Sequence, residues 1–101
     1  MRSVTTLTSV TTSDWIPVNW KQRDFKVGLG VAVTGTNTSK VEVCHENILA
    51  GETAVPMDHE TLTAVSASVA GAQTSPVTGV RLNCTAYTSG AVTMTVLQGV
   101  V

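Results

Sequence analysis

The chain has 101 residues, a formal net charge of −1 and only four aromatic residues, Trp15, Trp20, Phe25 and Tyr87. This length predicts a single domain, residues 1–101, that buries about 65% of the surface of its unfolded chain and folds without a metal ion or a disulfide. Its wealth of valine, threonine and serine favours strands, and its scattered basic residues exclude the basic stripe of a nucleic-acid-binding domain.

The first segment, residues 1–14, carries one arginine but lacks the continuous apolar core of a signal peptide. No stretch of the chain approaches the roughly 20 apolar residues of a membrane span. We therefore expect a chain that folds in a cytoplasm and has no membrane partner. Residues 5–12 are rich in β-branched side chains but alternate poorly, which predicts a strand at a sheet edge or one donated to a neighbouring subunit.

The next segment, DWIPVNW, holds both tryptophans around a proline. Pro17 cannot donate a ladder hydrogen bond, so this segment is expected to be an edge strand or an extended connection. Trp15 and Trp20 are five residues apart and therefore face opposite sides of an extended segment. One is expected in the core, and the other is a candidate for stacking on a sugar or for anchoring a protein interface.

Residues 25–35 show the clearest strand pattern, with apolar side chains at every second position from Phe25 to Val33. The opposite face carries Lys26, Gly28, Gly30 and Ala32. Since glycine weakens a strand, these small residues indicate either a partner packed closely against them or a bulge or strong coiling of the sheet.

A turn at residues 35–38 and a returning strand at 40–46 complete a predicted hairpin. Residues 47–62 then lose all alternation, which predicts a long loop. Loops of this length in small domains are often functional or order against a partner. Its apolar side chains favour that interpretation over a solvated excursion, and they are Ile48, Leu49, Val55 and Met57.

A further strand is predicted at residues 63–70, and a second hairpin at 80–98 that turns at 88–90, where Gly90 can take a positive φ. One face of this hairpin is apolar, and the other carries Asn83, Thr85, Thr93 and Thr95, which suit wet, polar contacts. The pattern predicts a compact all-β domain, an antiparallel β-sandwich or jelly roll of six to eight short strands.

Reactive residues are few. Cys44 and Cys84 fall on strand faces of different character, so no disulfide is expected, as in a reducing compartment. His45 is expected on the inward face with Val41 and Val43, and the Cys44–His45 pair lacks the ligand spacing of a zinc site. His59 lies in the run Asp58–Glu60, which is expected to be solvated. No enzyme activity, metal or cofactor is therefore predicted.

Three features resemble small virion proteins of tailed bacteriophages: Ser3, Val4 and Leu7, then Trp15-Ile16-Pro17, then the segment Val80 to Gln98. The resemblance implies a capsid decoration or cement protein, a β-sandwich or jelly roll that binds the major capsid protein, commonly as a homotrimer, in virions assembled in the host cytoplasm. The alternatives are a head-to-tail connector or tail component, and a carbohydrate- or receptor-binding module. The candidate interface residues are Trp15, Pro17, Trp20, Gly28, Gly30, Ile48, Leu49, Val55 and Met57.

Overall fold

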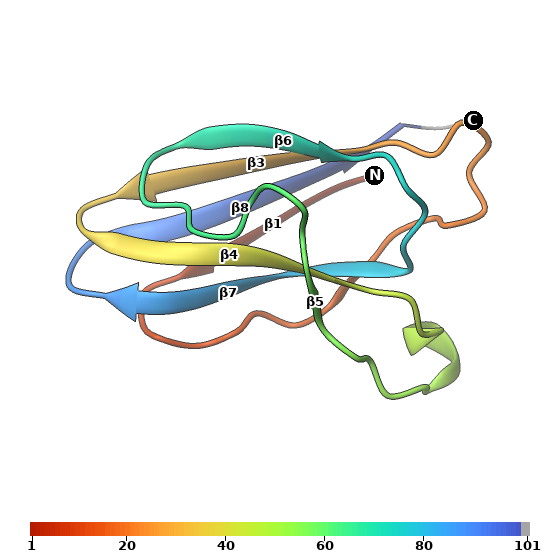
Figure 1. Cartoon of the computed structure of the whole chain (residues 1–101), viewed down its shortest axis with the longest axis horizontal. Coiled ribbons are helices and arrows are strands. Elements are labelled where there is room, and N and C mark those ends of the chain that lie inside the picture. Colours follow the sequence, from red (N-terminus) through yellow and green to blue (C-terminus); the bar gives the residue numbers. More distant parts are fainter. Residues whose placement is uncertain (100–101) are drawn as a thin grey trace.

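The computed structural model describes residues 1–99, which form two packed β-sheets (Figure 1). The strands are β1 (Arg2–Leu7), β2 (Ile16–Pro17), β3 (Val27–Thr34), β4 (Asn37–Cys44), β5 (Met57–Asp58), β6 (Val69–Gln73), β7 (Gly79–Tyr87) and β8 (Ala91–Gln98), with one 3-10 helix, η1 (Ile48–Ala50), within residues 1–99. Sheet A has the order β1-β8-β3-β6, and sheet B has the order β2-β7-β4-β5. The predicted all-β antiparallel sandwich is confirmed.

The order of pairing is that of a jelly roll. β1 pairs with β8, β2 with β7, β3 with β6 and β4 with β5, so the chain is a long antiparallel hairpin of four strand pairs. The further pairs β3–β8 and β4–β7 roll this hairpin into two sheets. Eight strands arranged in this way form the jelly roll, one of the two architectures that the sequence left open.

The core lies between the sheets and takes every second residue of the four long strands. These residues are Val27, Leu29 and Val31 of β3, Val41 and Val43 of β4, Val80, Leu82 and Cys84 of β7, and Val92, Met94 and Val96 of β8. Phe25, just before β3, is also buried. Each large apolar side chain contributes about 1.5–3 kcal/mol when it is fully buried, so this shared layer holds the two sheets together.

Both predicted hairpins are wrong in one respect, because their arms belong to different sheets. β3 lies in sheet A and β4 in sheet B, and β7 and β8 are divided in the same way. Alternation identifies the apolar face of each strand, but two apolar faces can meet across a core as well as side by side in one sheet. In a jelly roll the short turns are the corners where the chain crosses between sheets.

Two glycines make these corners possible, at the left end of the molecule in Figure 1. Gly35 and Gly90 have φ angles of 73° and 82°, as predicted for Gly90. A Cβ on Gly90 would collide with the carbonyl oxygen of Thr34, so glycine is required there. The two corners are joined by hydrogen bonds of 3.1 Å from the Thr36 N–H and from Asn37 Nδ2 to the Ser89 carbonyl.

Two strands lie elsewhere than predicted. β1 spans Arg2–Leu7 in place of the predicted residues 5–12. Beyond Leu7 the chain runs along β7, where the Ser13 N–H donates to the Leu82 carbonyl and the Cys84 N–H donates to the Thr11 carbonyl. The prediction of a strand at 63–70 was largely wrong, because β6 spans Val69–Gln73. Within 63–68 only Val65 pairs, by an isolated bridge to Ser39. The part of β6 that pairs regularly with β3 includes three small residues, Ala70, Gly71 and Ala72.

The two cysteines lie on opposite faces of sheet B, as their alternation predicted. Cys84 belongs to the core, whereas Cys44 is buried outside it, with its sulfur 3.5 Å from the Thr78 hydroxyl. Both are free thiols. The position predicted for His45 was wrong: β4 ends at Cys44, so the alternation stops there and His45 is exposed.

Candidate docking surface

The outer face of sheet A is a continuous surface of small and uncharged side chains. Because the strands alternate, the residues opposite the core positions point outward from four neighbouring strands. We call this surface the neutral face, and its residues are Val4 and Thr6 (β1), Thr93, Thr95 and Leu97 (β8), Gly28, Gly30 and Ala32 (β3), and Ala70 and Ala72 (β6).

No segment within residues 1–99 covers the neutral face. Val4 and Leu97 are 46% and 51% exposed. A Cβ on Gly30 would meet nothing within 4 Å, and one on Gly28 would make only ordinary contact, at 3.7 Å or more, with Leu97. The glycines leave a shallow hollow of about 240 Å³ between Leu97, Thr95 and Ala70.

The bulge interpretation of Gly28 and Gly30 was wrong. Both glycines pair in register on each side, with β8 and with β6. The register shift lies elsewhere, between Thr38 and Ser39 of β4. The lack of side chains therefore serves no irregularity in β3, and what it produces is a flat, open surface.

Charge on the neutral face is confined to one end. The four strands of sheet A carry one charged side chain, Arg2, which stands at the start of β1, on this same face and opposite Leu97. Its polar groups are threonine hydroxyls, of which Thr6 and Thr93 bond to each other over 3.0 Å. Away from Arg2, such a surface can be desolvated at low cost, since no buried charge has to be matched by the partner.

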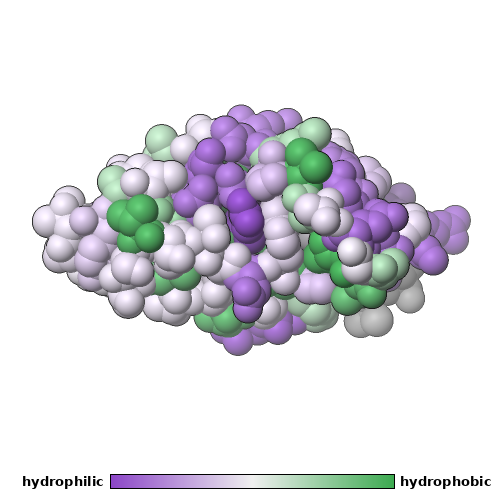
Figure 2. All heavy atoms as spheres, turned by 90° about the horizontal axis from the view of Figure 1, so that it is seen from below, coloured by the Kyte–Doolittle hydropathy of each residue, from purple (hydrophilic) through white to green (hydrophobic). Residues whose placement is uncertain are grey.

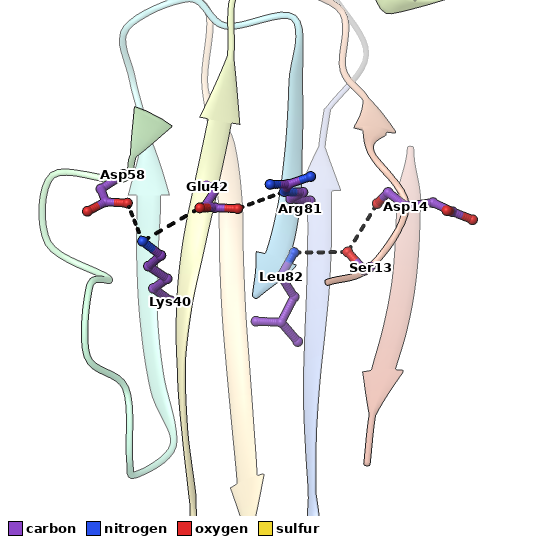
Figure 3. A network of polar contacts seen from close by, with 7 residues as sticks. All are labelled: Ser13, Asp14, Lys40, Glu42, Asp58, Arg81 and Leu82. Atoms are coloured by element: carbon purple, nitrogen blue, oxygen red, sulfur yellow. Dashed lines mark hydrogen bonds and ion pairs between the residues drawn. The ribbon is translucent and has the colours of Figure 1, made fainter. Parts of the chain in front are cut away.

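The outer face of sheet B differs, because it carries a chain of ion pairs, shown in Figure 3. Lys40 lies 2.9 Å from Asp58 and 3.6 Å from Glu42, and Arg81 Nε donates to Glu42 over 2.7 Å. The hydrogen bond to Asp58 raises the pKa of Lys40 above its usual value. The charges on this face are thus satisfied within the chain.

Trp15, the first of the candidate interface residues, lies beside this network. The guanidinium of Arg81 is 4.6 Å from the centre of the Trp15 ring. The Ser13 hydroxyl accepts from the Leu82 N–H and donates to the Asp14 carbonyl (Figure 3), which holds the chain before Trp15 along β7. The prediction that one tryptophan is in the core was wrong: Trp15 is half-buried, Trp20 is 44% exposed, and Val18 between them is the buried residue.

Trp20 lies in a short loop that is fixed to the end of β8. The buried Gln98 side chain accepts from the Asn19 N–H over 2.7 Å and donates to the Asn19 carbonyl over 2.9 Å. It also donates to the Gln22 side chain over 2.9 Å. The Gln98 side chain therefore fixes the position of the loop that carries Trp20.

The long loop holds its apolar side chains outward. Glu46 accepts a hydrogen bond from the Val55 N–H over 2.8 Å, and this bond lowers the pKa of the Glu46 carboxyl. Within the loop, Leu49 is 81% exposed, and Val55 and Met57 are about half exposed. Ile48 instead packs at Gly79, near Ile16 and Pro17. Figure 2 views the molecule from below, and on this side the apolar side chains form small, separated patches.

His59 is buried, so the prediction of a solvated Asp58–Glu60 run was wrong at its centre. Its Nε2 donates to the Ala72 carbonyl over 2.9 Å, and its Nδ1 accepts from the N–H groups of Thr61 and Leu62. Among residues 1–99 no group of three His, Cys, Asp or Glu side chains is placed to hold a metal ion. In the same part of the chain no helix is long and apolar enough to cross a membrane.

The candidate residues thus lie on two sides of the molecule. Trp15, Pro17 and Ile48 gather on sheet B, whereas Gly28 and Gly30 lie on sheet A, and no single flat surface contains them all. Comparison of the chain with protein-family models, with curated proteins and with solved structures finds no match. The neutral face is open at Gly28 and Gly30 and carries no charge beyond Arg2, and it is the candidate docking surface.

Proposed function

We propose that this chain is a non-enzymatic structural protein of a bacteriophage virion, which decorates the capsid shell and contacts the major capsid protein through the neutral face. The observation that carries the proposal is an open sheet face with two bare glycines and no charge beyond Arg2. The resemblance of the N-terminal segment and of residues 80–98 to small virion proteins supports the same function, and jelly rolls occur in viral capsid domains.

A repeated shell suits a partner of this kind. Small residues and hydroxyl groups give flat, weak contacts, and a self-associating protein that binds several neighbouring capsid subunits gains avidity from the lattice. A non-enzymatic role is also supported by the ion pairs of sheet B, in which Lys40, Glu42, Asp58 and Arg81 neutralise one another. Both ring nitrogens of His59 are also occupied.

Binding to capsid shells that lack the protein tests the proposal. Gly30→Glu places a charge at the centre of the neutral face, in open space where the added Cβ meets nothing within 4 Å. We expect the wild type to co-sediment with the shells and Gly30→Glu to bind at least about tenfold more weakly, which corresponds to 1.4 kcal/mol. Its thermal unfolding should stay near that of the wild type.

Ser9→Glu is the matched control, because it adds the same charge at an exposed position outside both sheets. It should bind as the wild type does. Absence of wild-type binding would refute the shell as partner, and full binding by Gly30→Glu would refute the neutral face as the contact.

A carbohydrate-binding module is the second candidate, because jelly rolls also occur in lectins and Trp20 is exposed. The Trp15 ring is less suitable, since Arg81 already stacks on it and the nearby carboxylate of Glu42 is bound to Arg81. Binding to a glycan array that is lost in Trp20→Ala would favour this function. A tail or connector role is distinguished by where the protein lies in the particle.

A further inference from the structure

Within residues 1–99 the two sheets have four edge strands, and three of them are less suited to further pairing. β2 and β5 are two residues long, and β2 contains Pro17. On β6 the carbonyl of Ala72 is already bonded to His59. β1 is different, because it spans six residues with no proline, and no other segment among residues 1–99 pairs with its outer side.

The register of β1 identifies the free backbone groups. Met1 and Gln98 are a directly bonded pair, with the Gln98 N–H donating to the Met1 carbonyl over 2.9 Å. Bonded pairs alternate along an antiparallel ladder, so Ser3, Thr5 and Leu7 bond to β8. The N–H and C=O groups of Arg2, Val4 and Thr6 therefore point to the open edge.

From this arrangement we propose that β1 pairs with β1 of a second copy of the chain, antiparallel and centred on Val4. In this register Val4 faces Val4 of the second copy, and Arg2 faces Thr6. Each of the three pairs makes two backbone hydrogen bonds, so every free backbone group of both edges is satisfied. Arginine faces threonine, and no like charges are opposed.

The contact is isologous, as two-fold dimers require, because the same residues contribute from both copies. It joins the two A sheets into one, and it places the two neutral faces side by side, since Val4 and Thr6 belong to them. This pairing is a two-fold contact, in contrast to the trimer that the resemblance implies. It does not depend on the proposed function, and it is tested without capsid shells.

Sedimentation equilibrium over a range of protein concentrations measures the mass of the assembly. We expect a reversible monomer–dimer equilibrium for the wild type. Val4→Pro removes the N–H group at the centre of the contact but leaves the bonds from Ser3 and Thr5 to β8 in place, so it should be monomeric. Val4→Lys opposes two like charges without changing the backbone, and it should also be monomeric.

Cysteine cross-linking tests the register. Bonded antiparallel partners have Cα atoms about 5.5 Å apart, within disulfide range, so Val4→Cys should form a covalent dimer under mild oxidation. Thr6→Cys is the matched control: it faces Arg2 of the second copy and should not cross-link. Cys44 and Cys84 are buried and should not contribute.

A wild-type protein that stays monomeric at all accessible concentrations would overturn the inference. So would a trimer, a dimer that persists in both Val4→Pro and Val4→Lys, or equal cross-linking of the two cysteine variants. None of these outcomes bears on whether Gly30→Glu impairs binding to shells, so the two proposals fail separately.

Discussion

His59 Nε2 donates a hydrogen bond to the carbonyl oxygen of Ala72 across 2.9 Å, and this bond ties the long loop to the edge of β6. The Nδ1 atom of the same ring accepts from two backbone N–H groups at 3.2 Å. Because the Ala72 oxygen can only accept and the two backbone N–H groups can only donate, Nε2 is the donor and Nδ1 the acceptor. His59 thus holds residues 59–62 against sheet A.

Removing the His59 side chain should destabilise the protein substantially. His59→Ala leaves a carbonyl and two N–H groups without their partner and opens a cavity, so we expect the free energy of unfolding to fall by about 3 kcal/mol in urea denaturation. The matched control is His45→Ala, an exposed histidine, which should change it by less than about 0.5 kcal/mol. Similar effects of the two variants would contradict the structural role of His59.

The ion pairs of sheet B should contribute unequally to the free energy of unfolding. Glu42 is buried, with 7% of its side chain exposed, and Glu42→Gln leaves Arg81 without its carboxylate. We expect a loss of about 2 kcal/mol, because an unmatched charge would remain in a partly buried site. Asp58→Asn removes an exposed partner of Lys40 and should cost less than about 1 kcal/mol. Thermal unfolding of both variants checks the order.

Substitutions at two glycines should change the free energy of unfolding in opposite directions. Gly30→Thr adds a β-branched residue to a strand with open space above it, so the free energy of unfolding should rise by about 0.5–1 kcal/mol. Gly90→Ala adds a Cβ at a φ of 82°, against the Thr34 carbonyl, and should lower it by more than about 1 kcal/mol. A stabilising Gly90→Ala would contradict the corner geometry.

The long loop should keep its conformation into mildly acidic solution. The pKa of Glu46 is lowered from its usual value of 4.5, chiefly by the hydrogen bond from the Val55 N–H. A lowered pKa means that the carboxylate stabilises the loop at pH values above the unfolded-state pKa, and that this contribution disappears as the pH falls through the folded-state pKa.

An NMR titration of the Val55 amide proton measures this directly. Its shift should follow Glu46 with a midpoint below 4.5, and Glu46→Gln should abolish that titration. A midpoint at or above 4.5 in the wild type would show that the hydrogen bond does not hold the loop.

Much of the fold could be predicted because strand faces are encoded locally. The alternation from Phe25 to Val33 identified the core side of β3, and the same pattern identified the inward residues of β7 and β8. Strand pairing is not encoded in this way. Whether two apolar faces lie side by side or meet across a core depends on the whole topology, and so both hairpins were assigned to single sheets.

The candidate site was predictable to a similar degree. Gly28 and Gly30 marked the neutral face from the sequence, but Val4, Ala70 and Ala72 joined it only through the register of three other strands. His59 was missed because its partners are backbone groups, which carry no sequence signal. Trp15 was misjudged because Arg81, far along the chain, covers its ring.

A density map of the decorated particle tests the central claim most directly, since it reveals which surface of the jelly roll meets the shell. We predict that sheet A faces the capsid protein, with Gly28, Gly30 and Leu97 in the contact and the Lys40–Glu42–Arg81 ion pairs turned toward solvent. A particle in which the sheet B ion pairs lie against the shell, or in which the protein is absent from the shell, would contradict it.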